Sequence, residues 1–394
     1  MMNDIERIIL DLEQVKLNQY WPGFEKVAYA LYDETSAYIF NHPNFDNQQV
    51  VDKKEQFHAC TLIMYEGYPT AIVDLRLFKH YEDLYSILVH ELFHGYQHLK
   101  GEKRFPDELM GISYPITVEN VELRNQERLS LFHALMEKEP LTKKEYLNTF
   151  IARRQQRELQ LGAYLEYENL IETIEGPAWY VEFHAYYETS QLEFSTVLQK
   201  YGEPLINQYQ STVNIRRSCY SSGLFMCLLL DELSPGWKEN FFSTEKTIYQ
   251  YVKELSVFDA PFRTIEVSSD TERVVHAVFQ NKEAEFTMFN EEEGIHLMII
   301  GKMEATSFDP MNIVMFAGKV LHKNFLKVKI QEREYLFAQP VVAYGEKLRQ
   351  FDKLQLKLEQ EPIERDSSLF IEGIGDIKGT VEKKGNQLYL YIED

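Results

Sequence analysis

The sequence contains little cysteine and fewer basic than acidic residues. Its three cysteines, Cys60, Cys219 and Cys227, do not make a disulfide framework. We interpret them as buried thiols of a reducing compartment, which indicates a cytoplasmic protein in which cysteine is not the expected metal ligand. With 41 Lys and Arg against 62 Asp and Glu, the formal net charge is −21. Because the chain has no excess of positive charge that would attract phosphate groups, we expect no nucleic-acid partner.

Long apolar runs are also absent. The densest run, LFMCLLL at 224–230, is far shorter than a membrane-spanning helix. The first residues, MMNDIERIILDLEQ, are acidic and amphipathic, which is not typical of a signal peptide. The sequence therefore predicts no membrane partner. Hydrophobic residues still make up 44% of the 394 positions, which is enough to bury a full core in two or three domains.

The most informative stretch is the five-residue motif His90-Glu91-Leu92-Phe93-His94. Two histidines four residues apart on a helix project from the same face, so both imidazoles can bind one metal ion. Glu91 is too close along the chain to be a third ligand, but it can reach a water on the metal. This H-E-x-x-H pattern is typical of zinc hydrolases, in which the carboxylate takes the proton of that water. The alternative is a buried amphipathic helix with two structural histidines.

A zinc ion held by two histidines needs a third ligand from elsewhere, and a His2Glu set leaves the fourth position open for water. The segment ETIEGPAWYVE, residues 172–182, offers Glu175 directly before a Gly-Pro pair. We favour Glu175 as this ligand. Glu172 and Glu182 lie near the same helix face, so either could instead be the ligand or a partner of the ligands. A glutamate on the helix surface is the alternative for all three.

These two motifs in this order resemble the gluzincin metallopeptidases. Their aminopeptidase branch carries H-E-x-x-H and then a motif close to E-G-F-A, which HELFH at 90–94 and EGPAWY at 175–180 match. The resemblance implies a zincin-type domain that binds Zn²⁺, with three ligands and a general base. Carried over by position, the ligands are His90, His94 and Glu175, and the base is Glu91.

The sequence departs from the aminopeptidase branch in two respects. About 80 residues separate the two motifs, and we attribute the excess to an inserted helical pair at 119–160. The exopeptidase motif G-A-M-E-N is absent, so the resemblance does not extend to recognition of a free N-terminus. Within the inserted pair, the RRQQR run at 153–157 is most simply interpreted as a solvated helix face.

A third match lies in IRRSCYSSGLFMCLLLDE, residues 215–232, where we expect an apolar helix to begin at Tyr220. In the aminopeptidase branch a tyrosine three residues before a glycine stabilises the oxyanion, so the resemblance implies this catalytic role for Tyr220. A packed tyrosine at a helix N-terminus is the alternative, and Ser221 or Ser222 would cap the helix in either case.

Three other polar residues lie close to these motifs in sequence. His98 follows His94 by one turn and points progressively away from a shared metal, so we interpret it as a surface residue or a supporting one. Tyr180 and His184 follow the proposed glutamate ligand on its own helix and compete with Tyr220 for the oxyanion role.

The apolar patterns predict an α+β chain. A helix is expected at 3–17, then a small N-terminal sheet, then the metal-binding helix and a mainly helical region. The expected strands lie at 26–33, 36–42, 57–65 and 69–75, and the later helices at 119–138, 141–160, 163–188 and 244–255. The sheet could add an extended peptide at its edge or only cover the helix.

Beyond Pro261 the chain becomes a succession of short β-like runs, which include RVVHAVFQ at 273–280 and EFTMFN at 285–290. We therefore expect a metallopeptidase domain at 1–258 and an all-β domain, sandwich or barrel, at 259–394. The sequence contains no chemical motif that would assign a role to the second domain.

The expected function is that of a zinc-dependent hydrolase, an enzyme that cleaves peptide bonds of a peptide or protein substrate. A non-catalytic binding protein of the same fold and a zinc hydrolase for a non-peptide bond are the alternatives. Retention of Glu91 argues against the first alternative, because a purely structural zinc site is closed and needs no base. Substrate preference and assembly as a homo-oligomer stay open.

Overall fold

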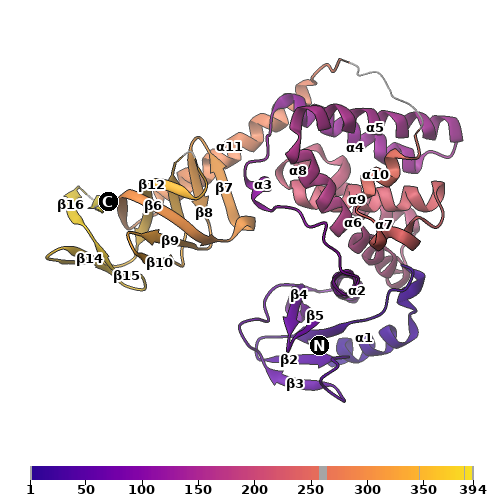
Figure 1. Cartoon of the computed structure of the whole chain (residues 1–394), viewed down its shortest axis with the longest axis horizontal. Helices are drawn as coiled ribbons and strands as arrows, with labels where there is room; N and C mark the ends of the chain where they lie inside the picture. The colour runs from indigo at the N-terminus through magenta and orange to yellow at the C-terminus, as the bar shows by residue number, and fades with distance from the viewer. Residues whose placement is uncertain (1, 257–263, 346, 386, 393–394) are drawn as a thin grey trace. The chain divides into compact units, whose positions relative to one another are not determined.

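The computed structural model describes residues 2–256, 264–345, 347–385 and 387–392 of an α+β chain (Figure 1). The chain forms two compact units. The first comprises the residues up to Pro106 together with Ile116–Thr271, and the second comprises Asp107–Pro115 and the residues from Glu272 onward. The domain boundary expected between 258 and 259 lies outside the described residues and stays a prediction.

The first unit opens with helix α1 and a five-stranded sheet of order β3-β2-β1-β5-β4. Strands β1 and β5 run parallel, and the other neighbours are antiparallel. The sheet expected from the sequence is therefore confirmed, with one strand more than expected, because the short, partly exposed QVVD of β3 carries little apolar signal. The bounds are α1 (Met2–Gln14), β1 (Ala28–Tyr32), β2 (Ser36–Phe40), β3 (Gln49–Asp52), β4 (Thr61–Tyr65) and β5 (Tyr68–Asp74).

Helix α2 (Tyr81–Leu99) carries the H-E-x-x-H motif and packs against strand β5. Its aliphatic side chains, among them Leu88, Val89 and Leu92, are fully buried in the core of the unit. Gly95 faces Val27 so closely that a Cβ at this position would overlap the valine side chain. The helix can therefore approach the start of the sheet only because residue 95 lacks a side chain.

The rest of the first unit is helical, as expected. Helix α6 packs against α2 on one side and α9 on another, and α4 packs against α5. The bounds are α4 (Val118–Met136), α5 (Pro140–Leu161), α6 (Ala163–Ser190), α7 (Phe194–Ile206), α8 (Gln208–Val213), α9 (Ile215–Leu233) and α10 (Ile248–Lys253). Short 3₁₀ helices connect the larger elements: η1 (Leu17–Gln19), η2 (Leu75–Leu77) and η3 (Trp237–Ser243).

Helix α6 continues for 28 residues even though Pro177 lies inside it. Proline normally kinks or ends a helix because it lacks an N–H group and its ring crowds the preceding turn. Burial on several sides offsets this cost, since the segment from Ile171 to Phe183 is buried throughout. Four glutamates of the same helix are also buried: Glu168, Glu172, Glu175 and Glu182.

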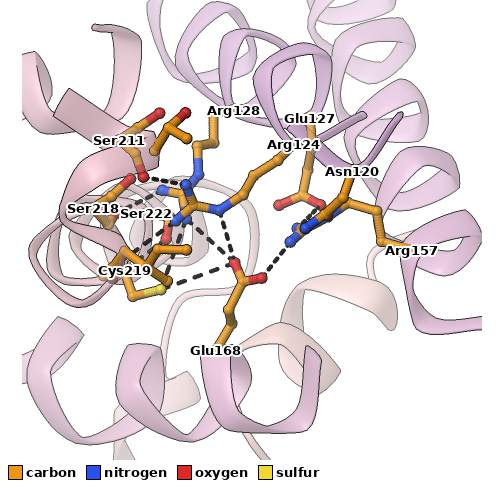
Figure 2. A network of polar contacts seen from close by, with 12 residues as sticks. Asn120, Arg124, Glu127, Arg128, Arg157, Glu168, Ser211, Ser218, Cys219 and Ser222 are labelled. Carbon is orange, nitrogen blue, oxygen red and sulfur yellow. Dashed lines mark hydrogen bonds and ion pairs between the residues drawn. The ribbon is translucent and has the colours of Figure 1, made fainter. Parts of the chain in front are cut away.

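Buried arginines neutralise the first two of these carboxylates. Arg154 of α5 donates to Glu127 of α4 at 2.6 Å and to Glu172 of α6 at 2.5 and 2.8 Å. Arg157 donates to Glu127 at 2.7 Å and to Glu168, a contact that Figure 2 shows. All five side chains are fully buried, so the three helices are tied together without solvent.

Glu168 receives further partners from α4. The Nε of Arg124 and an amino nitrogen of Arg128 lie 3.2 and 3.4 Å from its Oε2 (Figure 2). Arg128 also donates to the carbonyl of Ser218 in α9 at 2.7 Å. Although burial alone raises the pKa of a carboxyl, Arg157, Arg124 and Arg128 hold the pKa of Glu168 well below its usual range. We call this set the Arg–Glu network: Arg124, Arg128, Arg154, Arg157, Glu127, Glu168 and Glu172.

The network corrects one expectation. The RRQQR run at 153–157 was expected to form a solvated face, but Arg154 and Arg157 are among the largest fully buried side chains. The physical reason is that their partners lie on α4 and α6, far away in sequence. Charged residues stay in a protein interior only when such partners are present.

The second unit contains a long helix where strands were expected. Residues 273–280 and 285–290 lie in helix α11 (Ser269–Glu291), so the prediction of β-like runs there is wrong. The buried residues of α11 recur at helical spacing over a longer window than either run: Val275, Val278, Phe286 and Phe289. The residues between the two runs, 281–284, lie on the same helix.

The region that follows α11 is all-β, as expected. One sheet has the order β10-β9-β6-β12-β11-β8-β7, with β17 paired to both β6 and β16, and a small sheet has the order β13-β14-β15. Short helices α3 (Leu109–Ile112) and η4 (Pro310–Asn312) belong to the same unit. The strand bounds are β6 (Ile295–Phe308), β7 (Ile313–Phe316), β8 (Lys319–His322), β9 (Leu326–Ile330), β10 (Arg333–Phe337), β11 (Val341–Tyr344), β12 (Gln350–Leu358), β13 (Ile363–Arg365), β14 (Ser368–Ile371), β15 (Gly375–Lys378), β16 (Thr380–Lys384) and β17 (Gln387–Tyr391).

Across the described part of the chain, no helix combines the length and the apolarity that crossing a membrane requires.

The Arg–Glu network generates a stability prediction. Arg154→Met should lower the free energy of unfolding by about 3–5 kcal/mol, because it leaves Glu127 and Glu172 buried with fewer partners. Urea-induced unfolding measures this loss as a shift in the midpoint. Lys144→Met is the matched control, since Lys144 is exposed on the same helix, and its effect should stay within about 0.5 kcal/mol. Equal losses in the two variants would show that the network does not stabilise the unit.

Candidate metal centre

The two histidines of the motif and the favoured glutamate converge on one point. The Nε2 atoms of His90 and His94 lie 3.0 Å apart. The Oε2 atom of Glu175 lies 3.5 Å from the first and 3.3 Å from the second. All three atoms lie within 4.8 Å of one another, as required of ligands to a single metal ion. Helix α2 thus supplies two candidate ligand atoms and helix α6 the third.

Each histidine is fixed through its other ring nitrogen. His90 Nδ1 lies 2.9 Å from Glu182 Oε2, and the other oxygen of Glu182 accepts a hydrogen bond from Tyr201 at 2.9 Å. His94 Nδ1 lies 2.7 Å from the side-chain oxygen of Gln97, whose amide donates to the carbonyl of Ile174 at 2.8 Å. Because both partners are acceptors, each Nδ1 donates the proton and each Nε2 presents a lone pair.

The three facing atoms fit a bound cation. Glu175 Oε2 is buried and accepts no hydrogen bond, so its desolvation is not offset by an ordinary donor. Three lone pairs that face one another within 3.5 Å repel each other unless a positive charge lies between them. A His2Glu set is also the donor set of catalytic zinc sites. The residues present therefore fit zinc.

The titration behaviour of the ligands agrees with this fit. Burial lowers the pKa of His90, but the neighbouring carboxylates of Glu175 and Glu182 outweigh it and raise the pKa to about 10. Burial raises the pKa of Glu175, but His94 and His90 outweigh it and hold the pKa well below its usual range. Without a metal ion, a proton on the histidines supplies the positive charge that the carboxylates require.

Glu91 lies beside the ligands but has a different environment. Its side chain is buried, and burial raises the pKa of its carboxyl despite the opposing effect of His90 and His94. Among the described residues, none donates a hydrogen bond to this carboxylate. The carboxylates of Glu91, Glu175 and Glu182 and the guanidinium of Arg216, which pairs with Glu175, together carry a net charge of −2 when both histidines are neutral. That charge matches a divalent cation.

Tyr220 also lies at the cluster. Its ring is stacked near that of His90 with the centroids 6.3 Å apart, and its hydroxyl accepts a hydrogen bond from Arg216 Nε at 3.1 Å. Burial and the carboxylate of Glu175 raise the pKa of Tyr220, although Arg216 opposes them, so the phenol keeps its proton. A protonated phenol beside the ligands can donate a hydrogen bond to a bound molecule.

The start of the Tyr220 helix differs from the expected one. Helix α9 begins at Ile215, and Asn214 caps it by accepting a hydrogen bond from the N–H of Arg217. Ser221 and Ser222 are not caps, because both lie buried inside the helix. The first of these serines donates to the carbonyl of Tyr201 at 2.6 Å, and the second donates to Glu172. The polar residues that looked like a helix start are contacts between helices.

A pair of glycines sets the separation of α6 and α9 at the site. A Cβ on Gly223 would lie 2.6 Å from the Cα of Gly176 and 2.7 Å from the carbonyl oxygen of Glu172. Both obstacles are backbone atoms, which cannot move aside as a side chain can. Glu175 directly precedes one glycine and Tyr220 precedes the other by about one turn. The close helix contact therefore places the third candidate ligand, Glu175, beside Tyr220.

The other candidate residues lie elsewhere. Glu172 belongs to the Arg–Glu network, and His98 is exposed at the end of α2. Tyr180 donates to Asp231 at 2.6 Å and accepts from Lys238 at 2.6 Å. His184 packs against the rings of Tyr180 and Tyr20. None of these four candidates is among the residues that form the His2Glu cluster of the described chain.

Three residues at the site were missed by the sequence analysis: Gln97, Tyr201 and Arg216. The helical spacing contained a signal for two of them. Gln97 follows His94 by three residues and Arg216 precedes Tyr220 by four, so each lies on the same helix face as its partner. Tyr201 comes from α7, and no local pattern connects it with Glu182.

Comparisons of the chain with protein-family models, with curated proteins and with solved structures return no match. The arrangement of the site must therefore carry any functional conclusion.

The glycine pair generates the first prediction for this site. Gly223→Ala should weaken metal binding strongly, because the added methyl group separates α9 from α6 next to Glu175. Competition with a chelator measures the affinity of the folded protein for zinc. Gly202→Ala is the control, since its methyl group would meet side-chain rings and not backbone, that of Phe225 at 2.9 Å and that of Phe132 at 3.5 Å. The control variant should lose stability yet keep the zinc affinity of wild type. Equal zinc affinity in Gly223→Ala and wild type would refute the role of the helix contact.

A second prediction concerns pH and His184. Burial, assisted by the positive charge of Lys238, lowers the pKa of His184 to about 4, although Asp231 opposes the shift. The unfolded chain, with an ordinary histidine pKa of about 6.5, therefore binds more protons between these two values. The contribution of neutral His184 to the free energy of unfolding is therefore fully present above about pH 6.5 and is lost as the pH falls toward 4.

His184→Phe should therefore reduce the loss of stability between about pH 6.5 and pH 4, because phenylalanine keeps the ring contacts but does not titrate. Urea midpoints measured at several pH values for wild type and variant provide the comparison. His98→Phe, which replaces an exposed histidine, should retain the pH dependence of wild type. A His184→Phe variant with the same acid dependence as wild type would contradict the assignment.

Proposed function

We propose that this chain is a zinc-dependent hydrolase that cleaves peptide bonds. The observation that carries the proposal is the convergence of His90 Nε2, His94 Nε2 and Glu175 Oε2 beside a carboxylate with no hydrogen-bond donor among the described residues, that of Glu91. A structural zinc site uses four protein ligands and needs no base. A three-ligand set with a neighbouring carboxylate instead suits hydrolysis, and supports an enzyme over a non-catalytic binding protein.

When bound at this cluster, zinc would supply a Lewis acid and lower the pKa of a coordinated water to about 7. Glu91 would accept the proton of the attacking water, and would then deliver it to the leaving amine. The raised pKa of Glu91 suits this task, because a carboxylate with a higher proton affinity is a stronger base.

The negative oxygen that develops on the substrate requires a donor. The phenol of Tyr220 stays protonated and lies at the cluster, so we assign it the role of donating a hydrogen bond to that oxygen. Tyr180 is engaged with Asp231 and Lys238, and His184 is enclosed by aromatic rings. Their surroundings favour Tyr220 for the oxyanion role.

The resemblance to the gluzincin metallopeptidases is consistent with this chemistry, and we propose it as the relationship of this chain. The absence of G-A-M-E-N argues against an aminopeptidase. Peptides or proteins are the proposed substrates, and the three unpaired cysteines support a reducing, cytoplasmic location.

Metal analysis and peptide digestion together test the proposal. Wild type and Glu91→Gln should retain about one zinc per chain after dialysis, whereas His94→Ala should retain none, because it loses a ligand. Only wild type should digest a broad peptide library, and Glu91→Gln should lose about 10²–10⁴-fold in rate because an amide cannot accept the proton. His98→Ala is the control and should resemble wild type in both assays.

Two outcomes would contradict the proposal. Full zinc in His94→Ala would place the metal elsewhere, and unchanged digestion by Glu91→Gln would exclude it as the base. If wild type binds zinc and hydrolyses esters but no peptide, the proposed zinc chemistry would stand and the proposed substrate class would be wrong.

A further inference from the structure

Arg216 connects the third ligand with the proposed oxyanion donor. An amino nitrogen of its guanidinium lies 2.7 Å from Glu175 Oε1, and its Nε lies 3.1 Å from the hydroxyl oxygen of Tyr220. The side chain of Glu175 is 6% exposed and that of Arg216 is 21% exposed, so this ion pair is largely shielded from solvent. Arg216 and Tyr220 occupy successive turns of α9.

The contact gives the two oxygens of Glu175 different tasks. Oε1 accepts a charge-assisted hydrogen bond from Arg216, which is stronger than a neutral one. Oε2 accepts no hydrogen bond and faces the two histidines. A carboxylate with both oxygens available can bind a metal ion through both. Because Arg216 holds Oε1, Glu175 would bind a metal ion through Oε2 alone, and a coordination position would be left for water or substrate.

The same arginine also determines how Tyr220 can act. Since an arginine is always protonated, Nε is the donor and the phenol oxygen is the acceptor. The single proton of the hydroxyl is then directed to the other side, toward the carboxylate of Glu175, where it could donate to a negative oxygen of a bound substrate. A positive charge next to the phenol oxygen also strengthens the phenol as a donor.

We propose that Arg216 is a positioning residue that leaves Glu175 one oxygen for the metal and orients the hydroxyl of Tyr220 for donation. This inference rests on the proposed function. A lysine at this position keeps the charge but lacks the planar fork that reaches both partners. Arg216→Lys and Arg216→Met therefore separate geometry from charge.

The first test uses the cobalt-substituted protein, because four-coordinate Co²⁺ absorbs visible light more strongly than Co²⁺ with a higher coordination number. Arg216→Met should bind cobalt with weaker visible bands than wild type, since both oxygens of Glu175 become available. Arg216→Lys should also show weaker bands if the fork matters. Arg217→Met is the matched control: this neighbouring arginine lies over the ring of Trp179, 5.4 Å from its centre, and the variant should give the spectrum of wild type.

The second test measures coupling between Arg216 and Tyr220. In wild type, Tyr220→Phe should lower kcat about 10²–10³-fold with little change in KM. In the Arg216→Met background the same substitution should lower kcat less than about tenfold, because the hydroxyl is no longer oriented there. The Arg217→Met background should retain the full effect of Tyr220→Phe.

The outcomes separate this inference from the proposed function. A wild-type protein that binds no cobalt would overturn both. Cobalt binding with identical spectra in wild type and Arg216→Met, together with an undiminished effect of Tyr220→Phe, would overturn only the positioning role of Arg216. The spectra do not depend on hydrolysis, so the role in arranging the ligands is tested even without a substrate.

Discussion

The structure of the first unit depends on the need to neutralise the carboxylates that helix α6 carries into the interior. An ionised carboxylate without partners costs several kcal/mol in a protein core. Glu168 and Glu172 find arginines from α4 and α5, whereas Glu175 and Glu182 find histidines from α2 and hydroxyl or guanidinium groups from α7 and α9. Each surrounding helix must therefore lie at a defined position around α6. Apolar packing alone would allow more variation in the positions of these helices, because it has little directional preference.

The buried carboxylates in both halves of α6 need positive charge nearby, but the two halves obtain it in different ways. In the half that contains Glu172, arginines balance the charge permanently, because they stay protonated. In the half that contains Glu175, histidines and one arginine leave negative charge in excess, which a proton or a divalent cation can balance. Gly176, which directly follows Glu175, allows α9 to contact both halves, through Ser222 on one side and Arg216 on the other. The polar contacts that fix the helices around α6 thus also orient the candidate ligands.

The sequence predicted those features that depend on local spacing. His90 and His94 lie four residues apart on one helix, so their convergence requires no knowledge of other helices, and Gln97 could have been included for the same reason. Glu175 was favoured because it directly precedes Gly176 and Pro177 and because its motif resembles that of the aminopeptidase branch, whereas helical spacing alone did not separate it from Glu172 and Glu182. The burial of Arg154 could not be predicted, since its partners Glu127 and Glu172 lie in other helices. Helix α11 was missed because two short apolar runs were interpreted separately, without the longer period that connects them.

The candidate site is preformed because each of its three candidate ligands is held by an atom that does not face the other two. Glu182 fixes His90 through Nδ1, Gln97 fixes His94 through Nδ1, and Arg216 fixes Glu175 through Oε1. The conformational entropy of ordering these side chains is therefore lost during folding and not when a metal ion binds. The same three hydrogen bonds also cause the repulsion among the three facing atoms, because they hold these atoms together whether or not a cation is present. Binding of a divalent cation both relieves that repulsion and requires little rearrangement, which is the arrangement expected of a site that binds metal tightly.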